Sequence, residues 1–237
     1  MPSRSTPAAA APDRTRTYRV ATVAAFAVGA TAFGLLTDGA AEGGDLSAYD
    51  PQVLDDMVAA RSPSLTPIFQ TLTTIGSLPV VFTLSVVLVV VLAPRRAWSQ
   101  ALFALTAMVG SAALTVGLKA IVARHRPDSS VMLDGPDPEF SFPSGHTLNS
   151  TVFLLVVVWL VLRHTDRVGV RALTIAAAAA LAVGIGVSRL YLGYHWMTDV
   201  LAGWVLAPTW VALLTLLPRW SWWSARPAAP EAKTIER

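Results

Sequence analysis

The sequence lacks cysteine and is poor in charged residues. Without cysteine, the 237-residue chain cannot form disulfides, use a thiolate nucleophile or bind a metal through thiolates. Charged residues make up only 14% of the chain, whereas soluble domains carry roughly 25%. Hydrophobic residues reach 54%, so the composition indicates a protein whose main solvent is lipid.

Lysine is also scarce, and the net charge of +3 comes from an excess of arginine. A basic stripe with interleaved aromatic residues would indicate a nucleic-acid site. Here the basic residues fall instead at the ends of apolar runs. We therefore expect membrane lipids, and no nucleic acid, as partners.

Several apolar runs approach the ~20 residues that a helix needs to cross the hydrocarbon core of a bilayer. Backbone polar groups must be satisfied within the segment in lipid, which favours helices. The sequence thus predicts an all-α, multi-pass protein of the cell membrane, with six transmembrane helices at Tyr18–Leu36, Leu78–Ala93, Trp98–Leu118, Thr147–Leu162, Ala172–Val187 and Thr198–Leu217.

The segments around this transmembrane domain, residues 18–218, differ in composition. Residues 1–17 are proline-rich and basic and predict a disordered tail, and residues 219–237 predict a second tail. The first apolar run is long for a secretory signal, so we expect an uncleaved helix. Residues 39–77 mix apolar residues with aspartate and proline, which indicates an extracytoplasmic loop with an interfacial helix broken by Pro63 and Pro67.

The distribution of charge predicts the orientation. With the N-terminus inside, most of the 18 lysine and arginine residues lie on the cytoplasmic side and most of the 15 acidic residues lie outside. Both termini are therefore expected in the cytoplasm. The basic residues left outside are Arg61, Lys119, Arg124, Arg126 and Arg189.

Polar residues with phosphate-binding chemistry gather at the predicted outer helix ends. Lys119, Arg126 and Arg189 supply positive charge, and the two guanidinium groups can each hold an oxyanion through two hydrogen bonds. Ser144 adds a hydroxyl, and Gly145 lets an anion approach the backbone. The N–H groups at this helix start, that of Ser144 included, are expected to point outward as a phosphate seat.

Two histidines add reactive groups to this set. His195 and Asp199 are four residues apart, so in a helical turn they share a face. The carboxylate can hold one ring nitrogen and leave the other free as a nucleophile. His146, on another helix, can protonate a leaving group. Together these residues describe phosphoryl transfer through a covalent phosphohistidine, with the cations stabilising the transition state.

Three stretches resemble the signature of the type-2 phosphatidic acid phosphatase superfamily: "KAIVARHRP" (119–127), "PSGH" (143–146) and "SRLYLGYHWMTD" (188–199). They match the family patterns K-x6-R-P, P-S-G-H and S-R-x5-H-x3-D. The resemblance implies an integral membrane lipid phosphatase that needs no metal and no cofactor. His195 would be the nucleophile, Asp199 its orienting partner and His146 the general acid. The implied phosphate-binding residues are Lys119, Arg126, Ser144, Gly145 and Arg189.

Other residues near these motifs receive no chemical role. Arg124 and His125 occupy variable positions of the first pattern. The aromatic residues of the third motif are expected to anchor the chain at the membrane interface, namely Tyr191, Tyr194 and Trp196. Three acidic residues lack the regularity of metal ligands and are expected in a solvated loop, namely Asp134, Asp137 and Glu139.

The function expected from these features is hydrolysis of a lipid phosphate or diphosphate at the extracytoplasmic face. Polyprenyl diphosphate, phosphatidic acid and phosphatidylglycerol phosphate are all compatible, and recycling of a prenyl diphosphate fits a site outside the cytoplasm. Two alternatives stay open: a phosphotransferase that uses an acceptor other than water, and a non-catalytic lipid transporter. The histidines favour catalysis, because binding alone requires only the cations.

Overall fold

A computed structural model of the chain describes residues 14–217, and this range is entirely helical apart from turns and connections. The predicted apolar runs all lie on helices, which are α1 (Arg14–Glu42), α4 (Leu78–Leu92), α5 (Trp98–Val122), α6 (Gly145–His164), α7 (Val168–Tyr191) and α8 (Met197–Leu216). Helix α1 begins before Tyr18, so residues 14–17, predicted as tail, are helical. The rest of the predicted N-terminal tail and the C-terminal tail lie outside the described residues.

Five of these helices, α1, α5, α6, α7 and α8, are long and apolar enough to cross a membrane. Helix α4 has 15 residues and is about 22 Å long, which is less than the ~30 Å of the hydrocarbon core. Helix α3 (Thr66–Ile75) comes directly before α4 in the chain. The two helices meet at an angle of 44°, and together they form a sixth candidate span.

The segment before α4 contains more structure than the single interfacial helix that was predicted. A short 3-10 helix (Asp45–Tyr49) leads into α2 (Asp50–Ala59), and α3 follows. Pro63 lies in the connection between α2 and α3, as a helix breaker should. Pro67, however, lies in the first turn of α3. At that position the missing N–H has no helical partner to lose, so Pro67 starts a helix rather than breaking one.

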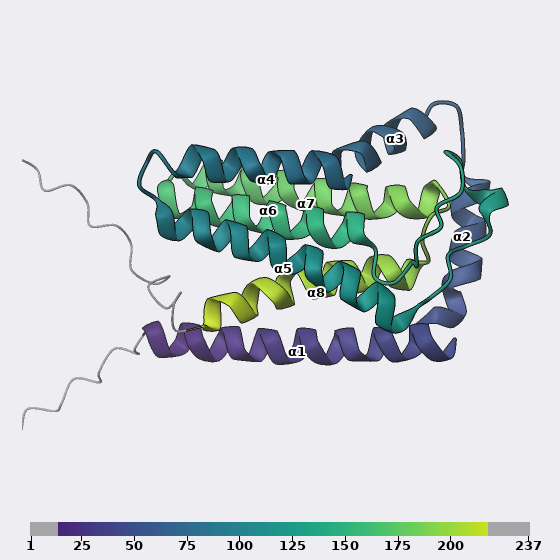
Figure 1. Cartoon of the computed structure of the whole chain (residues 1–237), viewed down its shortest axis with the longest axis horizontal. Helices are drawn as coiled ribbons and strands as arrows, with labels where there is room; N and C mark the ends of the chain where they lie inside the picture. Colours follow the sequence, from purple (N-terminus) through teal and green to yellow (C-terminus); the bar gives the residue numbers. More distant parts are fainter. Residues whose placement is uncertain (1–13, 218–237) are drawn as a thin grey trace, which may run out of the picture.

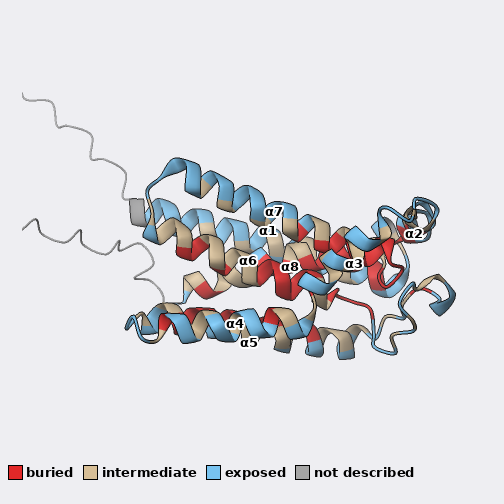
Figure 2. Cartoon of the chain, turned by 90° about the horizontal axis from the view of Figure 1, so that it is seen from above, coloured by how far each residue is buried: buried red, intermediate tan, exposed pale blue. Residues whose placement is uncertain are grey.

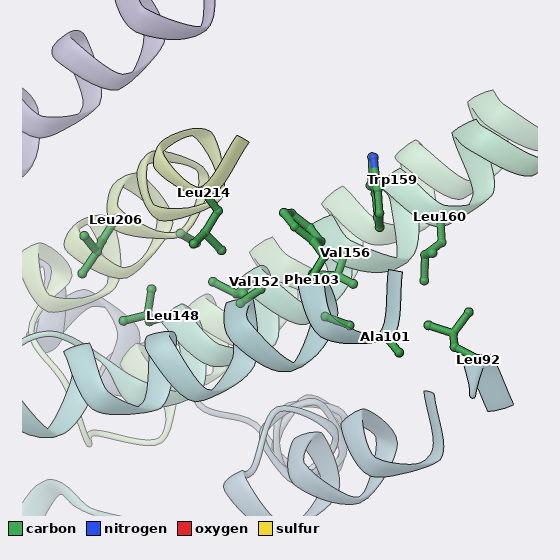
Figure 3. Close-up of a cluster of buried hydrophobic side chains, with 13 residues drawn as sticks. Leu92, Ala101, Phe103, Leu148, Val152, Val156, Trp159, Leu160, Leu206 and Leu214 are labelled. Carbon is green, nitrogen blue, oxygen red and sulfur yellow. The ribbon is translucent and has the colours of Figure 1, made fainter. Parts of the chain in front are cut away.

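Helix α6 lies at the centre of the bundle and packs against α4, α5, α7 and α8, while α1 lies along α8 (Figure 1). Leu148, Val152 and Val156 follow one another at every fourth residue of α6, and all three are fully buried (Figure 3). Phe103 of α5 packs on Trp159 of α6 with ring centroids 4.6 Å apart. This apolar contact joins α5 to α6 in the core of the bundle.

The two ends of the bundle differ. Helix α1 begins and α8 ends at one end, whereas α2, α3 and the connection between α5 and α6 cover the other (Figure 1). Buried residues run along α6 and α8 to the end near α3, while the first half of α7 is mostly exposed (Figure 2). The exposed first half of α7 is apolar, as a surface facing lipid should be.

Candidate active site

The predicted site residues all lie at the end of the bundle that carries α2 and α3. The last turns of α5 and α7 and the first turns of α6 and α8 meet there, because neighbouring helices run in opposite directions. These turns and the connections beside them supply Lys119, Arg126, Ser144, Gly145, His146, Arg189, His195 and Asp199.

His195 and Asp199 form the predicted pair. The Nδ1 atom of His195 lies 3.2 Å from Oδ2 of Asp199, and the same oxygen accepts the backbone N–H of Trp196 at 2.9 Å. The exposed fractions of the two side chains are 1% and 0%. Gly193 makes the preceding turn possible, since its φ is +85° and a Cβ there would lie 2.3 Å from the carbonyl oxygen of Val131.

The other ring nitrogen of His195 faces Arg126. Its Nε2 atom lies 3.0 Å from Nη1 of Arg126. A guanidinium group can only donate hydrogen bonds, so this contact requires an unprotonated Nε2 and places the ring proton on Nδ1, toward Asp199. The geometry therefore presents a neutral imidazole whose Nε2 lone pair accepts a hydrogen bond from a cation.

Electrostatics keep this imidazole neutral. Burial lowers the pKa of His195 well below its usual range, and the positive charges of Arg126, Arg189 and Lys119 lower it further. A buried neutral imidazole next to three cations is suited to attack a centre that carries anionic oxygens. The same cations can hold those oxygens.

A cleft of about 440 Å³ opens at this end of the bundle. Residues of α3 and of the connection before α6 line it together with His146, Arg189 and Tyr194. Arg189 donates from Nη1 to the hydroxyl of Thr73 at 2.7 Å and stacks over the ring of Tyr194 at 4.3 Å. Its Nε is buried and has no hydrogen-bond partner among the described residues, so a donor is available to an anion.

His146 completes the set in the first turn of α6. Its side chain lines the cleft together with Arg189. The predicted general acid, nucleophile and phosphate-binding cations are thus brought together by four helices. Among residues 14–217, no group of three or more histidine, aspartate and glutamate side chains could hold a metal ion.

Ser144 does not present its N–H outward, which corrects the sequence prediction. That N–H donates to the carbonyl of Asp199 at 3.1 Å, and the Ser144 hydroxyl accepts a hydrogen bond from Thr147 at 3.0 Å. Ser144 is fully buried and ties the start of α6 to α8. Gly145 follows it, and a Cβ there would lie 3.0 Å from the side chain of Thr115, so glycine allows α6 to begin close to α5.

The acidic loop before α6 is bound to the site rather than simply solvated. Glu139 Oε2 lies 2.7 Å from Nζ of Lys119, and Asp137 Oδ2 lies 2.8 Å from Nη2 of Arg126. The hydrogen bond from Lys119 lowers the pKa of Glu139 below its usual range. Two cations predicted to bind phosphate are therefore already paired with carboxylates.

Two of the aromatic residues predicted as interface anchors are buried, because their hydroxyl groups find partners inside the protein. Tyr191 is 1% exposed, and its hydroxyl accepts the N–H of Ser62 at 2.8 Å. Tyr194 donates to the carbonyl of Gly135 at 2.9 Å. They tie the connection between α2 and α3 and the connection between α5 and α6 to the segment that carries His195.

Arg124 and Asp50 were not predicted as part of the site. Arg124 donates to Asp199 Oδ1 and to Asp50 Oδ2, both at 2.7 Å. The sequence does carry a signal for Arg124, since an arginine on the outer side runs against the charge bias and needs a reason. It carries none for Asp50, which is one of several acidic residues in the segment before α4.

The sequence profile of the PAP2 superfamily matches residues 100–223. Phosphatidylglycerophosphatase B of Bacillus subtilis (strain 168) is 36% identical over 90 residues, which cover 38% of this chain and 43% of that protein. The enzyme of the same name from Escherichia coli (strain K12) is 34% identical over 96 residues, covering 40% and 36%. An undecaprenyl-diphosphatase of Sulfolobus acidocaldarius is 30% identical over 102 residues, covering 41% and 45%. The matched segment thus spans less than half of each relative.

The similarity to solved structures extends over more of the chain than the sequence matches do. The crystal structure of a transmembrane PAP2-type phosphatidylglycerolphosphate phosphatase from Bacillus subtilis matches with a TM-score of 0.69 and 26% identity, covering 78% of this chain and 93% of that one. The fold also resembles that of LpxE from Aquifex aeolicus, with a TM-score of 0.51 and 23% identity over 70% of this chain and 94% of that one. With its apolar helices, the chain is a multi-pass membrane protein. Since the profile covers more than half of the sequence and all of its predicted site residues, the chain belongs to the PAP2 superfamily.

Proposed function

We propose that this protein is an integral membrane phosphatase that hydrolyses a lipid phosphate or diphosphate through a phosphohistidine on His195, without a metal or other cofactor. One observation carries the proposal: the Nε2 of His195 lies 3.0 Å from Nη1 of Arg126, which can only donate, while Nδ1 lies 3.2 Å from Asp199 on the opposite side. A neutral, oriented imidazole next to a phosphate-binding cation is a prepared nucleophile.

In the first step, Nε2 of His195 attacks phosphorus and the bond from phosphorus to the leaving oxygen breaks. The electron pair of that bond goes to the leaving oxygen, which takes a proton from His146. The new phosphohistidine carries positive charge on its ring, and the carboxylate of Asp199 stabilises this charge through Nδ1–H. Lys119, Arg126 and Arg189 would stabilise the charge on the oxygens in the transition state.

In the second step, water attacks phosphorus and gives a proton to His146. The bond from phosphorus to Nε2 breaks, its electron pair returns to the ring, and phosphate leaves. Each step returns His146 to the protonation state that the other step requires, so one residue serves as acid and then as base.

An apolar groove close to the cleft supports the proposal that the substrate is amphiphilic. An apolar groove of about 310 Å³ runs between α4 and α5, from Leu78 to the level of Val90. It begins one residue after Ser77, which lines the cleft. An alkyl or prenyl chain in this groove would leave the phosphate at the cleft. Relatives are named for phosphatidylglycerophosphate and undecaprenyl diphosphate, and phosphatidic acid has the same amphiphilic form.

The site is proposed to face the extracytoplasmic side. It lies at the end of the bundle opposite to the start of α1 and the end of α8. Most basic residues of the sequence fall on the side of those two ends, which the positive-inside rule places in the cytoplasm.

Phosphate release by the purified protein in detergent tests this function. The assay supplies phosphatidic acid, phosphatidylglycerol phosphate and a polyprenyl diphosphate in the presence of EDTA. We expect release by the wild type, loss of at least about 10³-fold in His195→Ala, and near wild-type release by His164→Ala, whose ring bonds to Leu160 O at the other end of α6.

Further measurements on the purified protein, in detergent and in vesicles, separate the alternatives. Phosphate recovered on an added alcohol, with none in solution, would indicate a phosphotransferase. Movement of labelled lipid between leaflets of vesicles with no phosphate release would indicate a transporter. A substrate labelled on the transferred phosphorus should label the protein. An acid-labile, base-stable label on the protein that is absent in His195→Ala would support the phosphohistidine.

A further inference from the structure

Asp50 is a buried carboxylate on a helix that carries none of the family motifs. It is the first residue of α2 and is 1% exposed. Its Oδ1 accepts the backbone N–H of Thr198 at 2.9 Å, and its Oδ2 accepts the Thr198 hydroxyl at 2.5 Å. Thr198 is the second residue of α8, so Asp50 ties α2 to the helix start that holds Asp199.

Arg124 joins Asp50 to Asp199. Its Nη1 donates to Asp199 Oδ1 at 2.7 Å, and its Nη2 donates to Asp50 Oδ2 at 2.7 Å. The side chain of Arg124 is 13% exposed. Because the guanidinium group is planar and rigid, it holds the two carboxylates at a fixed separation, which a lysine could not do.

The two oxygens of Asp199 therefore have separate partners. Oδ1 accepts from Arg124, while Oδ2 accepts from Nδ1 of His195 and from the N–H of Trp196. The carboxylate cannot rotate without breaking a buried hydrogen bond, and a buried bond is costly to leave unmade. The orientation of the His195 ring thus depends on a network that reaches α2.

The network contains one guanidinium cation and two carboxylates, so Asp199 does not have to neutralise Arg124 alone. With Asp50 in place, the charge of Arg124 is shared between two carboxylates, and Asp199 keeps negative charge for the ring of His195. Without Asp50, the full charge of Arg124 would compete with the ring for Asp199. The other charged or titratable groups around His195 come from the ends of α5, α6 and α7 and the connection after α5, and they are Lys119, Arg126, His146 and Arg189.

We propose that Asp50 is a positioning residue of the active site, which acts through Arg124 and Asp199 on the ring of His195. Its effect on turnover rests on the proposed function. Helix α2 is then a support of the nucleophile as well as a cover of the bundle. Asp50 itself has no contact with the cations that would hold the phosphate.

Kinetics of Asp50→Asn and Arg124→Gln test the proposal. Asparagine can still accept from Thr198 but brings no charge. We expect kcat to fall about 10- to 100-fold in both variants, as happens when the carboxylate partner of a metal-bound histidine is removed, with KM within about threefold of wild type. The matched control is Arg171→Gln: Arg171 pairs with Asp166 and donates to the carbonyls of Thr165 and Leu162 at the other end of the bundle, so its kcat should stay within about twofold.

A second readout is independent of turnover. The chain has 4 histidines, so ¹⁵N-imidazole labelling gives few signals, and His195→Gln assigns one of them. In the wild type, His195 should be neutral with the proton on Nδ1. In Asp50→Asn and Arg124→Gln, its two nitrogen shifts should move toward their mean, because the tautomer is no longer fixed.

The two readouts separate the two proposals. If the wild type releases no phosphate but the His195 signals change in Asp50→Asn, the hydrolytic function fails and the positioning role stands. Unchanged His195 signals overturn the positioning role even if kcat falls, since Asp50 would then act only through folding. A kcat within twofold of an active wild type overturns it as well.

A milder pair of variants covers the case in which Asp50→Asn does not fold. Thr198→Val removes the hydroxyl that lies between Asp50 and Arg124 without changing any charge. Thr198→Ser keeps that hydroxyl. We expect at least a threefold loss of kcat and altered His195 signals for valine, and wild-type values for serine. Equal values for the two variants would count against the network.

Discussion

The Nη1 atom of Arg126 lies 3.0 Å from Nε2 of His195, on the side of the ring that faces away from Asp199. The same guanidinium group donates to the carbonyls of Tyr194 and Glu139, both at 2.8 Å, and pairs with Asp137. Arg126 therefore occupies the approach to the nucleophile and is held there by several acceptors. A phosphate that reaches His195 must meet this cation first.

Substitution of Arg126 by lysine is expected to lower kcat/KM by about 10²-fold or more, because a point charge cannot keep this set of contacts while holding a phosphate oxygen. Initial rates with a lipid phosphate in detergent measure the effect. Arg171→Lys is the control, since Arg171 also donates to two backbone carbonyls and pairs with an aspartate but lies at the other end of the bundle. Wild-type kcat/KM in Arg126→Lys would remove Arg126 from the proposed mechanism.

Glu139→Gln is expected to strengthen the binding of phosphate. In the free protein, Glu139 pairs with Lys119 at 2.7 Å, so an anion must displace a carboxylate to use that cation. Neutralising the carboxylate should lower the inhibition constant of inorganic phosphate about two- to tenfold. Competition assays at a fixed substrate concentration measure this constant. A higher inhibition constant in Glu139→Gln would show that the ion pair between Glu139 and Lys119 positions Lys119 for phosphate binding.

The control for this prediction is Asp128→Asn. Asp128 lies in the same connection, but its side chain accepts from the backbone of Ser130 and makes no ion pair within residues 14–217. Its substitution changes the net charge of the loop by the same amount. The inhibition constant should then stay close to the wild-type value, since a screened charge outside the cleft has a weak effect.

Local patterns in the sequence predicted the helices and most of the residues that the structure brings together at the candidate site. Apolar runs long enough for a bilayer indicate helices whatever their partners, and the interval between His195 and Asp199 needs only one helical turn to bring the two together. Helix α4 shows the limit of this rule. Its apolar run is short, and the sixth candidate span includes α3, whose polar threonines hide it from a hydropathy pattern.

The parts of the site that were missed depend on pairs far apart in the chain. Asp50 and Arg124 are separated by 74 residues, and the segment before α4 offers several acidic residues that could serve as the partner. Glu139 was assigned to a solvated loop, because its pairing with Lys119 requires the loop to fold back over α5. Tyr191 was expected at the membrane interface, since a tyrosine that anchors and one that is buried with a bonded hydroxyl have the same local sequence.

The acid limb of the pH profile is expected below pH 6.5. Catalysis requires a neutral His195, and burial together with Arg126, Arg189 and Lys119 lowers its pKa in the free protein. The dependence of kcat/KM on pH reports groups of the free enzyme, so the activity should persist under mildly acidic conditions. An acid limb at or above pH 6.5 would contradict the assignment of His195 as the nucleophile.

The same lowered pKa predicts how stability depends on pH. Between the folded pKa of His195 and about 6.5, the unfolded chain binds the additional proton, so stability is lost as pH falls through this window and is unaffected by this group above it. Thermal unfolding in detergent at pH 5 and pH 7 measures the slope. His195→Gln should show a smaller difference in Tm between the two conditions than the wild type does.

Gly193→Ala is expected to destabilise the turn that carries His195. The residue has a φ of +85°, and an added Cβ would lie 2.3 Å from the carbonyl oxygen of Val131, which is backbone and cannot turn away as a side chain could. The left-handed conformation alone costs about 1 kcal/mol for alanine. Gly43→Ala isolates this contribution, because Gly43 has a φ of +73° with nothing within 4 Å of the added Cβ.

We expect Gly193→Ala to lower the free energy of unfolding by at least about 2 kcal/mol more than Gly43→Ala does, because the clash adds to the conformational cost. Denaturant or thermal unfolding of both variants measures the difference. Activity should also fall in Gly193→Ala and not in Gly43→Ala, since a shift of the turn moves Nε2 relative to Arg126. Equal stability of the two variants would mean that the turn is free to move away from Val131, and the position of His195 would then have to be fixed by Asp199 alone.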